Sequence, residues 1–229
     1  MRDRNYFGSM MVETGEADAL ISGLTNEYPK TIRPALEIIG TEPGVKKVAG
    51  MSIMLDKKEP YFLADTSVSR NPNAEQLVDI VGLTSKRVEF FNVKPRIGMI
   101  SYSNFGSSNG DTPDKMKRAT ALAKERFPEL IIDGEMQADV ALSKRLLREN
   151  YPFSELAEKG ANTLVFPNLE AGNTAYKLLS KIADCEAIGP ILMGMNKPVH
   201  ILQISSDVRD IVNMVAIAVV DAQKLEESN

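Results

Sequence analysis

Three loops of the sequence combine small, hydroxyl and amide side chains in a way that suits the binding of an anion. They span residues 101–110 (SYSNFGSSNG), 133–139 (DGEMQAD) and 166–176 (FPNLEAGNTAY). Glycine lets the backbone approach a ligand closely, and the N–H groups at the start of a helix attract negative charge. The pattern indicates a phosphorylated ligand, although Gly/Ser-rich loops are more often plain surface loops. The candidate ligand-binding residues are Ser101, Ser103, Gly106, Ser107, Asn168, Gly172 and Asn173.

Charged side chains add two further candidates. Arg33, in the segment TIRPAL at residues 31–36, is expected near a helix start. It is either a clamp for phosphate or carboxylate, or a surface arginine whose stem covers apolar neighbours. Asp133, Glu135 and Asp139 place three carboxylates within seven residues. A metal or acid–base role would use them, and capping of a turn and a helix start explains them equally well.

Asp207 and Asp210 stand at the start of the last helical pattern in the chain. Asp207 is a suitable N-cap residue, and a carboxylate at Asp210 would lie in the first turn, where it interacts favourably with the helix dipole. A structural role therefore accounts for both residues from the local sequence.

Composition excludes several function classes. The 229 residues suffice for one sizeable core or for two small lobes, and 43% hydrophobic with 25% charged residues is ordinary for a soluble globular protein. A net charge of -4 without a basic segment gives no support to nucleic-acid binding. One cysteine excludes an internal disulfide, and one histidine, His200, excludes a metal site of several histidines. No membrane-spanning run or hydrophobic signal region is found, so we expect a cytoplasmic protein.

Strand and helix patterns alternate through most of the chain. Two helices are expected within residues 16–40, with a break at Tyr28–Pro29 and a stop at Gly40. A hairpin of strands is expected at 46–55 and 61–65. The last helix, 207–223, shows one apolar stripe, and Thr112 with Pro113 reads as the start of another helix. The remaining elements are expected as helices at 73–92, 112–127, 138–149 and after 168, and as strands at 96–103, 130–133, 164–167 and 199–203. This alternation predicts an α/β fold, a mostly parallel sheet with helices on both faces, and ligands at the carboxyl ends of its strands.

Several long segments, taken in order, resemble the phosphate acetyltransferase and butyryltransferase family. The version they resemble most forms the C-terminal domain of bacterial NADP-dependent malic enzymes. The resemblance extends over essentially the whole chain. It rests on the segments ADALISGLTNEYPKTIRPAL, ISYSNFGSS, IDGEMQADVAL, NTLVFPNLEAGNTAYKLL, EAIGPILMGMNKPVHIL and VRDIVNMVAIAVVDAQ.

The resemblance implies a two-lobed fold like that of isocitrate and isopropylmalate dehydrogenases, with CoA in the cleft between the lobes. The first lobe would comprise residues 1–45 and 198–229, and the second lobe residues 46–197. Family members carry a substantial stretch before the position that matches Met1, so the first lobe is expected to be truncated. Missing strands would expose a sheet edge or core surface.

Site residues follow from the resemblance position by position. Arg33 matches an arginine in the substrate cleft, and Asp210 matches the aspartate that deprotonates the CoA thiol. Active members have Ser-Arg-Gly before the last helix, where this chain has Gln203, Ile204 and Ser205. Gln203 can donate one neutral hydrogen bond, but isoleucine cannot neutralise phosphate charge. Losing such a charge-assisted donor lowers the rate by roughly two to three decades.

Three functions remain open from the sequence. The first is a regulatory module that binds acetyl-CoA or a related acyl metabolite, with little transfer, and controls a malic-enzyme domain in cis. The second is an active phosphate acetyl/butyryltransferase, which converts an acyl phosphate and CoA into acyl-CoA and phosphate. The third is a ligand-free oligomerisation scaffold. A homo-oligomer is expected, with no nucleic acid or membrane partner. This segment is expected to hold no cofactor or metal, since NADP and the divalent metal belong to the malic-enzyme part.

Overall fold

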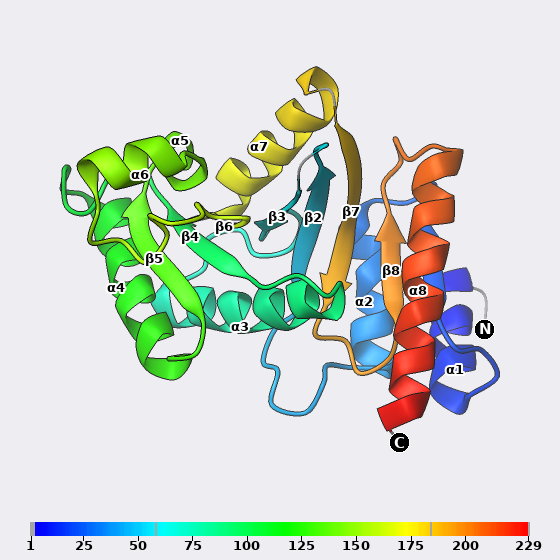
Figure 1. Ribbon diagram of the computed structural model, residues 1–229. Helices are drawn as coiled ribbons and strands as arrows, with labels where there is room; N and C mark the ends of the chain where they lie inside the picture. Colours follow the sequence, from blue (N-terminus) through cyan, green and yellow to red (C-terminus); the bar gives the residue numbers. More distant parts are fainter. Residues whose placement is uncertain (1–2, 58, 184, 229) are drawn as a thin grey trace. The chain divides into compact units, whose positions relative to one another are not determined.

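The computed structural model describes residues 3–57, 59–183 and 185–228, which form alternating helices and strands (Figure 1). The chain divides into two compact units. Unit 1 comprises residues 1–48 and 188–229, and unit 2 comprises residues 49–187. Residues 46–48 and 188–197 thus belong to unit 1, whereas the sequence analysis places them in the second lobe. The predicted α/β class is confirmed.

Unit 1 is built on two parallel strands, β1 (Leu20–Gly23) and β8 (Val199–Leu202). All four residues of β8 are buried, whereas all four of β1 are only half-buried. The helices α2 (Tyr28–Ile38) and α8 (Val208–Ser228) both contact β8. The sequence-predicted last strand and last helix are therefore confirmed, and together they form the centre of this unit.

The first forty residues differ from the sequence prediction. Only the second of the two expected helices exists, because the apolar segment Leu20–Gly23 forms β1 by pairing with β8. Pro29 lies in the first turn of α2, so the predicted break is the start of this helix. The structure also contains α1 (Arg4–Thr14), which the sequence analysis misses. The Asp3 carboxylate caps it by accepting hydrogen bonds from backbone N–H groups of the first turn.

Helix α8 packs on β8 with a face other than the predicted stripe. Met214 and Ala218 are each 2% exposed, and the buried His200 of β8 places Nε2 2.9 Å from Asp221 Oδ2. Exposed valines of the predicted stripe are Val208, Val212, Val215, Val219 and Val220. The prediction that α8 has one apolar stripe is wrong, because apolar side chains occupy more than one face of this helix. Among the described residues, only the face toward β8 is covered.

Unit 2 contains most of a six-stranded sheet with the order β5-β4-β6-β3-β2-β7. The predicted hairpin is confirmed as the antiparallel pair β2 and β3, and β3, β6, β4 and β5 pair in parallel. The strands are β2 (Ala49–Leu55), β3 (Pro60–Ala64), β4 (Arg96–Ile100), β5 (Ile131–Met136), β6 (Thr163–Val165) and β7 (Glu186–Met193). The carboxyl ends of the parallel strands therefore lie along one edge, where the candidate loops begin.

Helices cover both faces of this sheet (Figure 1). They are α3 (Ala74–Phe90), α4 (Asp111–Arg126), α5 (Ala138–Leu142), α6 (Lys144–Asn150) and α7 (Leu169–Ile182). Helix α4 starts after Gly110, so Thr112 is not its N-cap and Pro113 is its third residue. Ser143 splits the helix predicted at 138–149, because its side chain caps the start of α6. No described helix is long and apolar enough to cross a membrane.

The two faces of α8 should respond differently to truncation. Met214→Ala removes a buried side chain and should lower the free energy of unfolding by about 2–4 kcal/mol. Val212 lies on the same helix and is 60% exposed, so Val212→Ala should change the free energy of unfolding by less than about 0.5 kcal/mol. Urea denaturation measures both variants. If Val212→Ala lost more free energy of unfolding than Met214→Ala, the apolar stripe predicted from sequence would be the buried face, which would contradict the observed packing.

Candidate functional site

The loop after β3 is organised by one buried carboxylate. Asp65 is 3% exposed, and its Oδ1 accepts hydrogen bonds from the N–H groups of Gly50 (3.0 Å), Ser67 (2.9 Å) and Val68 (3.0 Å). Its Oδ2 accepts from Ser69 N–H at 2.8 Å. Hydrogen bonds to the charged form offset the cost of burying a carboxylate. Asp65 therefore fixes the path of the chain between β3 and α3.

Gly172 and Asn173, both candidates from sequence, hold α7 against this loop. A Cβ atom at Gly172 would lie 2.4 Å from the carbonyl oxygen of Asp65, so any larger residue would force the backbone apart. Asn173 Nδ2 donates a hydrogen bond to Thr66 O at 2.9 Å. The structure gives both residues a packing contact that sets where α7 begins.

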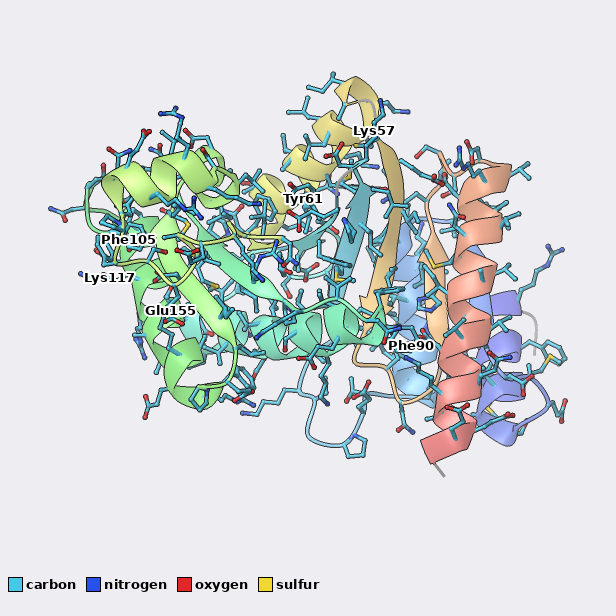
Figure 2. All side chains as sticks on the ribbon, viewed as in Figure 1. Lys57, Tyr61, Phe90, Phe105, Lys117 and Glu155 are labelled. Carbon is cyan, nitrogen blue, oxygen red and sulfur yellow. The ribbon has the colours of Figure 1, made fainter. Side chains whose placement is uncertain are left out.

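The serine-rich loop after β4 wraps around a second buried carboxylate. Glu135 is 1% exposed, and its Oε1 accepts hydrogen bonds from Ser103 Oγ (3.0 Å) and Gly106 N–H (2.6 Å). Ser103 Oγ in turn accepts from Ser108 N–H at 3.1 Å. Phe105 lies at the bend of this loop, with its ring 4.9 Å from that of Tyr151 (Figure 2). The buried carboxylate of Glu135 therefore fixes the conformation of the serine-rich loop.

The other two serines of this loop also bond within it. Ser101 Oγ accepts from Ser103 N–H at 3.3 Å, and Ser107 Oγ accepts from Asn104 N–H at 2.9 Å. Hydroxyl and N–H groups that the sequence offers to a ligand are thus used in the fold of the loop itself. Contact between these residues and a ligand remains a prediction.

The three acidic residues of the β5 loop do not converge. Asp133 Oδ1 accepts from Lys124 Nζ at 3.1 Å, Glu135 faces the serine-rich loop, and Asp139 is exposed on α5. Burial of Lys124 acts to lower its pKa, but contacts with Glu155 and Asp133 outweigh it and raise the pKa above its ordinary value. The three carboxylates are therefore not gathered at one point, and no group of three His, Cys, Asp or Glu residues that could hold a metal ion occurs among the described residues.

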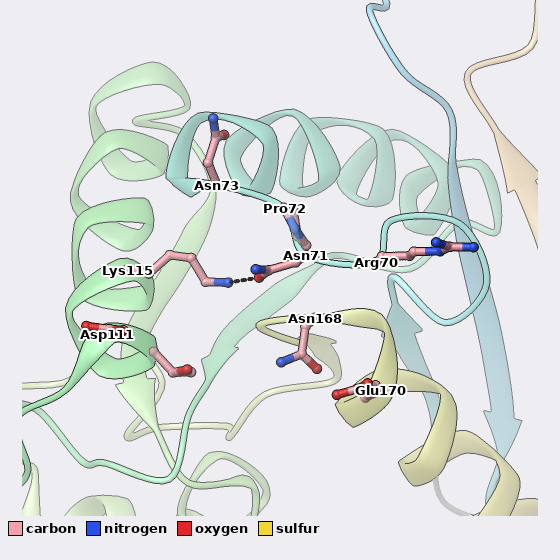
Figure 3. Close-up of a pocket in the computed structure, with 9 residues that line it drawn as sticks. Arg70, Asn71, Pro72, Asn73, Asp111, Lys115, Asn168 and Glu170 are labelled. Atoms are coloured by element: carbon pink, nitrogen blue, oxygen red, sulfur yellow. Dashed lines mark hydrogen bonds between the residues drawn. The ribbon is translucent and has the colours of Figure 1, made fainter.

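A pocket of about 640 Å³ lies between the starts of α3, α4 and α7 (Figure 3). Asn168 is the one candidate from sequence that lines it. Its Oδ1 caps α7 by accepting from Ala171 N–H at 2.9 Å. The remaining lining residues are Arg70, Asn71, Pro72, Asn73, Asp111, Thr112, Lys115 and Glu170.

Lys115 is one of the lining residues that the sequence analysis misses. Its Nζ donates hydrogen bonds to Asn71 Oδ1 (2.9 Å) and Pro167 O (2.8 Å). Burial lowers the pKa of Lys115 below its ordinary value. The Asn-Pro-Asn segment at 71–73, directly before a helix, is the sequence signal that could have pointed to this pocket, because it is typical of a turn that caps a helix. Lys115 itself has no local motif.

In unit 1, Arg33 is exposed on α2. It does not lie near the helix start as predicted, because α2 begins at Tyr28 and continues through Pro34. Glu37, one turn later, accepts a hydrogen bond from Tyr6 Oη. This bond raises the pKa of the Tyr6 phenol, and the Arg33 charge acts to lower it. Arg33 therefore belongs to an exposed charged cluster on α1 and α2.

The segment that leads into α8 is a turn followed by a reciprocal cap. Gln203 N–H donates to Ser206 Oγ at 3.1 Å, and the Ile204 side chain is 67% exposed. Asp207 N–H donates to Asp210 Oδ2 (3.0 Å), and Asp210 N–H donates to Asp207 Oδ1 (2.9 Å). The predicted cap at Asp207 and the predicted first-turn position of Asp210 are thus confirmed, and the Asp210 carboxylate additionally accepts the Asp207 N–H. Asp210 is consequently held in one place at the helix start.

The family model for phosphate acetyl/butaryl transferase matches residues 1–219. The chain belongs to this family. It is 43% identical over 223 residues to a phosphate acetyltransferase of Nitratidesulfovibrio vulgaris, with 97% of this chain and 32% of the relative covered. It is 42% identical over 218 residues to an NADP-dependent malic enzyme of Escherichia coli, with 94% of this chain and 28% of the relative covered. The chain thus spans about a third of the length of these two relatives.

Solved structures place the fold in the same family. A phosphotransacetylase from Streptococcus pyogenes matches with a TM-score of 0.91 and 38% identity, covering 97% of this chain and 68% of that one. The family and the fold implied by the resemblance are therefore confirmed. Nearly equal identities to the acetyltransferase and the malic enzyme leave the functional branch undecided.

Removing the charge of Glu135 should loosen the serine-rich loop. Glu135→Gln leaves one acceptor oxygen but places N–H groups among the donors of Ser103 and Gly106. We expect a loss of about 1–3 kcal/mol in the free energy of unfolding, with faster hydrogen exchange at the Gly106 amide. Asp139→Asn, an exposed carboxylate of the same segment, is the matched control and should change neither quantity. Unchanged exchange at Gly106 in Glu135→Gln would contradict this role.

Proposed function

We propose that this chain is a phosphotransacetylase-like regulatory module that binds acetyl-CoA or a related acyl metabolite and transfers acyl groups poorly. A malic-enzyme domain attached in cis would be the activity that it controls. Membership of the family supports the ligand class, and the similarity to the Escherichia coli malic enzyme supports the attached domain. NADP and a divalent metal would be bound by that domain and not by this segment.

The observation that carries the proposal is the side chain at position 204. Active family members are expected to have an arginine here, where it would donate charge-assisted hydrogen bonds to a phosphoryl group. Ile204 is 67% exposed, so its environment would accommodate an arginine, but isoleucine donates nothing. Without such a donor, transfer should be slower by roughly two to three decades.

Asp210 keeps the other half of the expected chemistry. Its carboxylate is held by the backbone of Asp207, and it can accept the proton of a thiol, which would leave a thiolate. The exposed guanidinium of Arg33 offers a bidentate contact for a phosphate of CoA. Gln203 would contribute one neutral hydrogen bond. These groups support recognition of the ligand. The absence of an arginine at position 204 would lower the rate of acyl transfer.

Two other functions have specific support. The phosphate acetyltransferase relative, at 43% identity, supports an active enzyme that uses an acyl phosphate and CoA. The exposed apolar face of α8 supports an assembly role, since such faces are commonly covered in oligomers. A regulatory module must bind its ligand more tightly in one global state than in the other, which neither alternative requires.

Restoring the expected pair should raise acyl transfer. In the double variant Gln203→Ser with Ile204→Arg, CoA acetylation from acetyl phosphate should increase by about 100-fold, because a charged donor returns to the phosphoryl group. The measurement is the rate of acetyl-CoA formation. Asp210→Asn in the double variant is the control. It can keep the hydrogen bond from Asp207 N–H, but it removes the base and should abolish the gain. A fast rate in the unaltered chain would identify an active transferase and overturn the proposal.

Acetyl-CoA should act on the intact protein as a regulatory ligand. We expect it to raise the melting temperature of the chain and to change the rate of malate oxidation by an attached malic-enzyme domain, because ligand binding to one state shifts the equilibrium. Thermal unfolding and a malate assay measure the two effects. If acetyl-CoA changed neither the melting temperature nor the rate of malate oxidation, the regulatory function would be excluded and the oligomerisation scaffold would remain.

A further inference from the structure

The pocket between the starts of α3, α4 and α7 gathers polar groups that the proposed function does not use (Figure 3). It lies wholly within unit 2, and its volume of about 640 Å³ is in the usual range for small-molecule pockets. Lys115 from α4 points toward Asn71 across it, while the Arg70 side chain extends away from both residues (Figure 3). Lys115 is therefore the cation on the inner side of the pocket.

Lys115 is held in place by neutral groups. Its two hydrogen-bond acceptors are an amide oxygen and a carbonyl oxygen, at 2.9 Å and 2.8 Å. An ammonium group has three N–H donors, so one remains for a ligand. Among the described residues no carboxylate forms an ion pair with Lys115, and burial lowers its pKa. An anion bound beside it would supply the missing negative charge.

The carboxylates of the pocket limit what kind of anion fits. Asp111 and Glu170 line it from the first turns of α4 and α7. They would repel a bare phosphate, but ionised carboxylates accept hydrogen bonds from hydroxyl groups. Asn168 uses its Oδ1 to cap α7, which leaves its Nδ2 as a donor. A suitable ligand therefore carries a phosphate at one end and hydroxyl groups at the other.

We propose that this pocket binds a phosphorylated polyol of the size of a sugar phosphate, with its phosphate on Lys115 and its hydroxyls on Asp111 and Glu170. The ligand is either a free sugar phosphate or the phosphorylated ribose of a nucleotide such as CoA, which share this chemistry. The proposal does not rest on acetyl-CoA binding by the residues of unit 1.

Calorimetric titration of the whole chain near neutral pH tests the site. Ribose 5-phosphate should bind saturably and more tightly than inorganic phosphate, and ribose alone should not bind. Lys115→Gln should weaken ribose 5-phosphate binding by about tenfold or more, because a charge-assisted hydrogen bond is lost. Lys117→Gln is the matched control, since Lys117 is an exposed lysine of the same helix outside the pocket (Figure 2). It should bind like the unaltered chain.

A second variant keeps the test informative if Lys115→Gln fails to fold. Glu170→Gln, at an exposed position, should bind inorganic phosphate more tightly and lose the preference for ribose 5-phosphate. The affinity for ribose 5-phosphate should also fall at alkaline pH, earlier than for an ordinary lysine site, because the ammonium of Lys115 loses its proton at a lowered pKa.

Four outcomes are decisive. The absence of saturable binding up to about 10 mM ribose 5-phosphate would overturn the proposal, as would equal binding by Lys115→Gln and the unaltered chain. If CoA binding falls together with ribose 5-phosphate binding in Lys115→Gln, the pocket holds the phosphorylated ribose of CoA. If CoA binding is unaffected while ribose 5-phosphate binding falls, the pocket is a separate site for a free sugar phosphate.

Discussion

The carboxylate of Asp65 is the contact on which the functional edge of unit 2 depends. It accepts four backbone N–H groups, one from β2 and three from the loop after β3, and so replaces the hydrogen bonds that this loop would otherwise make with water. The loop then leads directly to the capping residue Asn73 of α3. The carbonyl oxygen of Asp65 also lies against Gly172, which sets the start of α7. The pocket walls that these helices form therefore have a common anchor.

A second principle of this structure is that polar groups of the loops bond mainly to the protein. Glu135 takes the donors of Ser103 and Gly106, and Asp207 and Asp210 cap each other. Such internal bonds make loops rigid, which favours precise placement of the few groups that remain for a ligand. Lys115 is such a group, since its two partners are neutral and its charge has no counter-ion among the described residues.

Unit 1 contains the turn on which the proposed loss of acyl transfer rests. Nearly the whole chain matches a solved phosphotransacetylase structure with a TM-score of 0.91. The proposed chemistry depends on a short turn before α8, in which Ile204 is exposed and Asp210 is fixed by backbone hydrogen bonds. The turn is held by hydrogen bonds from Gln203 N–H to Ser206 Oγ and from Ser206 N–H to Gln203 O. Since neither bond uses the side chain at position 204, that side chain can change without altering the turn. Under the proposed function, the side chain at position 204 lowers turnover on a scaffold that is shared with the family.

Sequence alone determined the features that local physics controls. Alternating patterns predicted the α/β class, the hairpin of β2 and β3 and the last strand and helix. The local sequence also predicted the cap at Asp207 and the first-turn position of Asp210. Long motifs in register identified the family. Tertiary structure decided the rest. Leu20–Gly23 became a strand only by pairing with β8, and α8 buried Met214 and Ala218 because β8 covers that face. Lys115 reached Asn71 and Pro167 only because the sheet brings segments 44 and 52 residues apart to one edge, and no local pattern encodes such contacts.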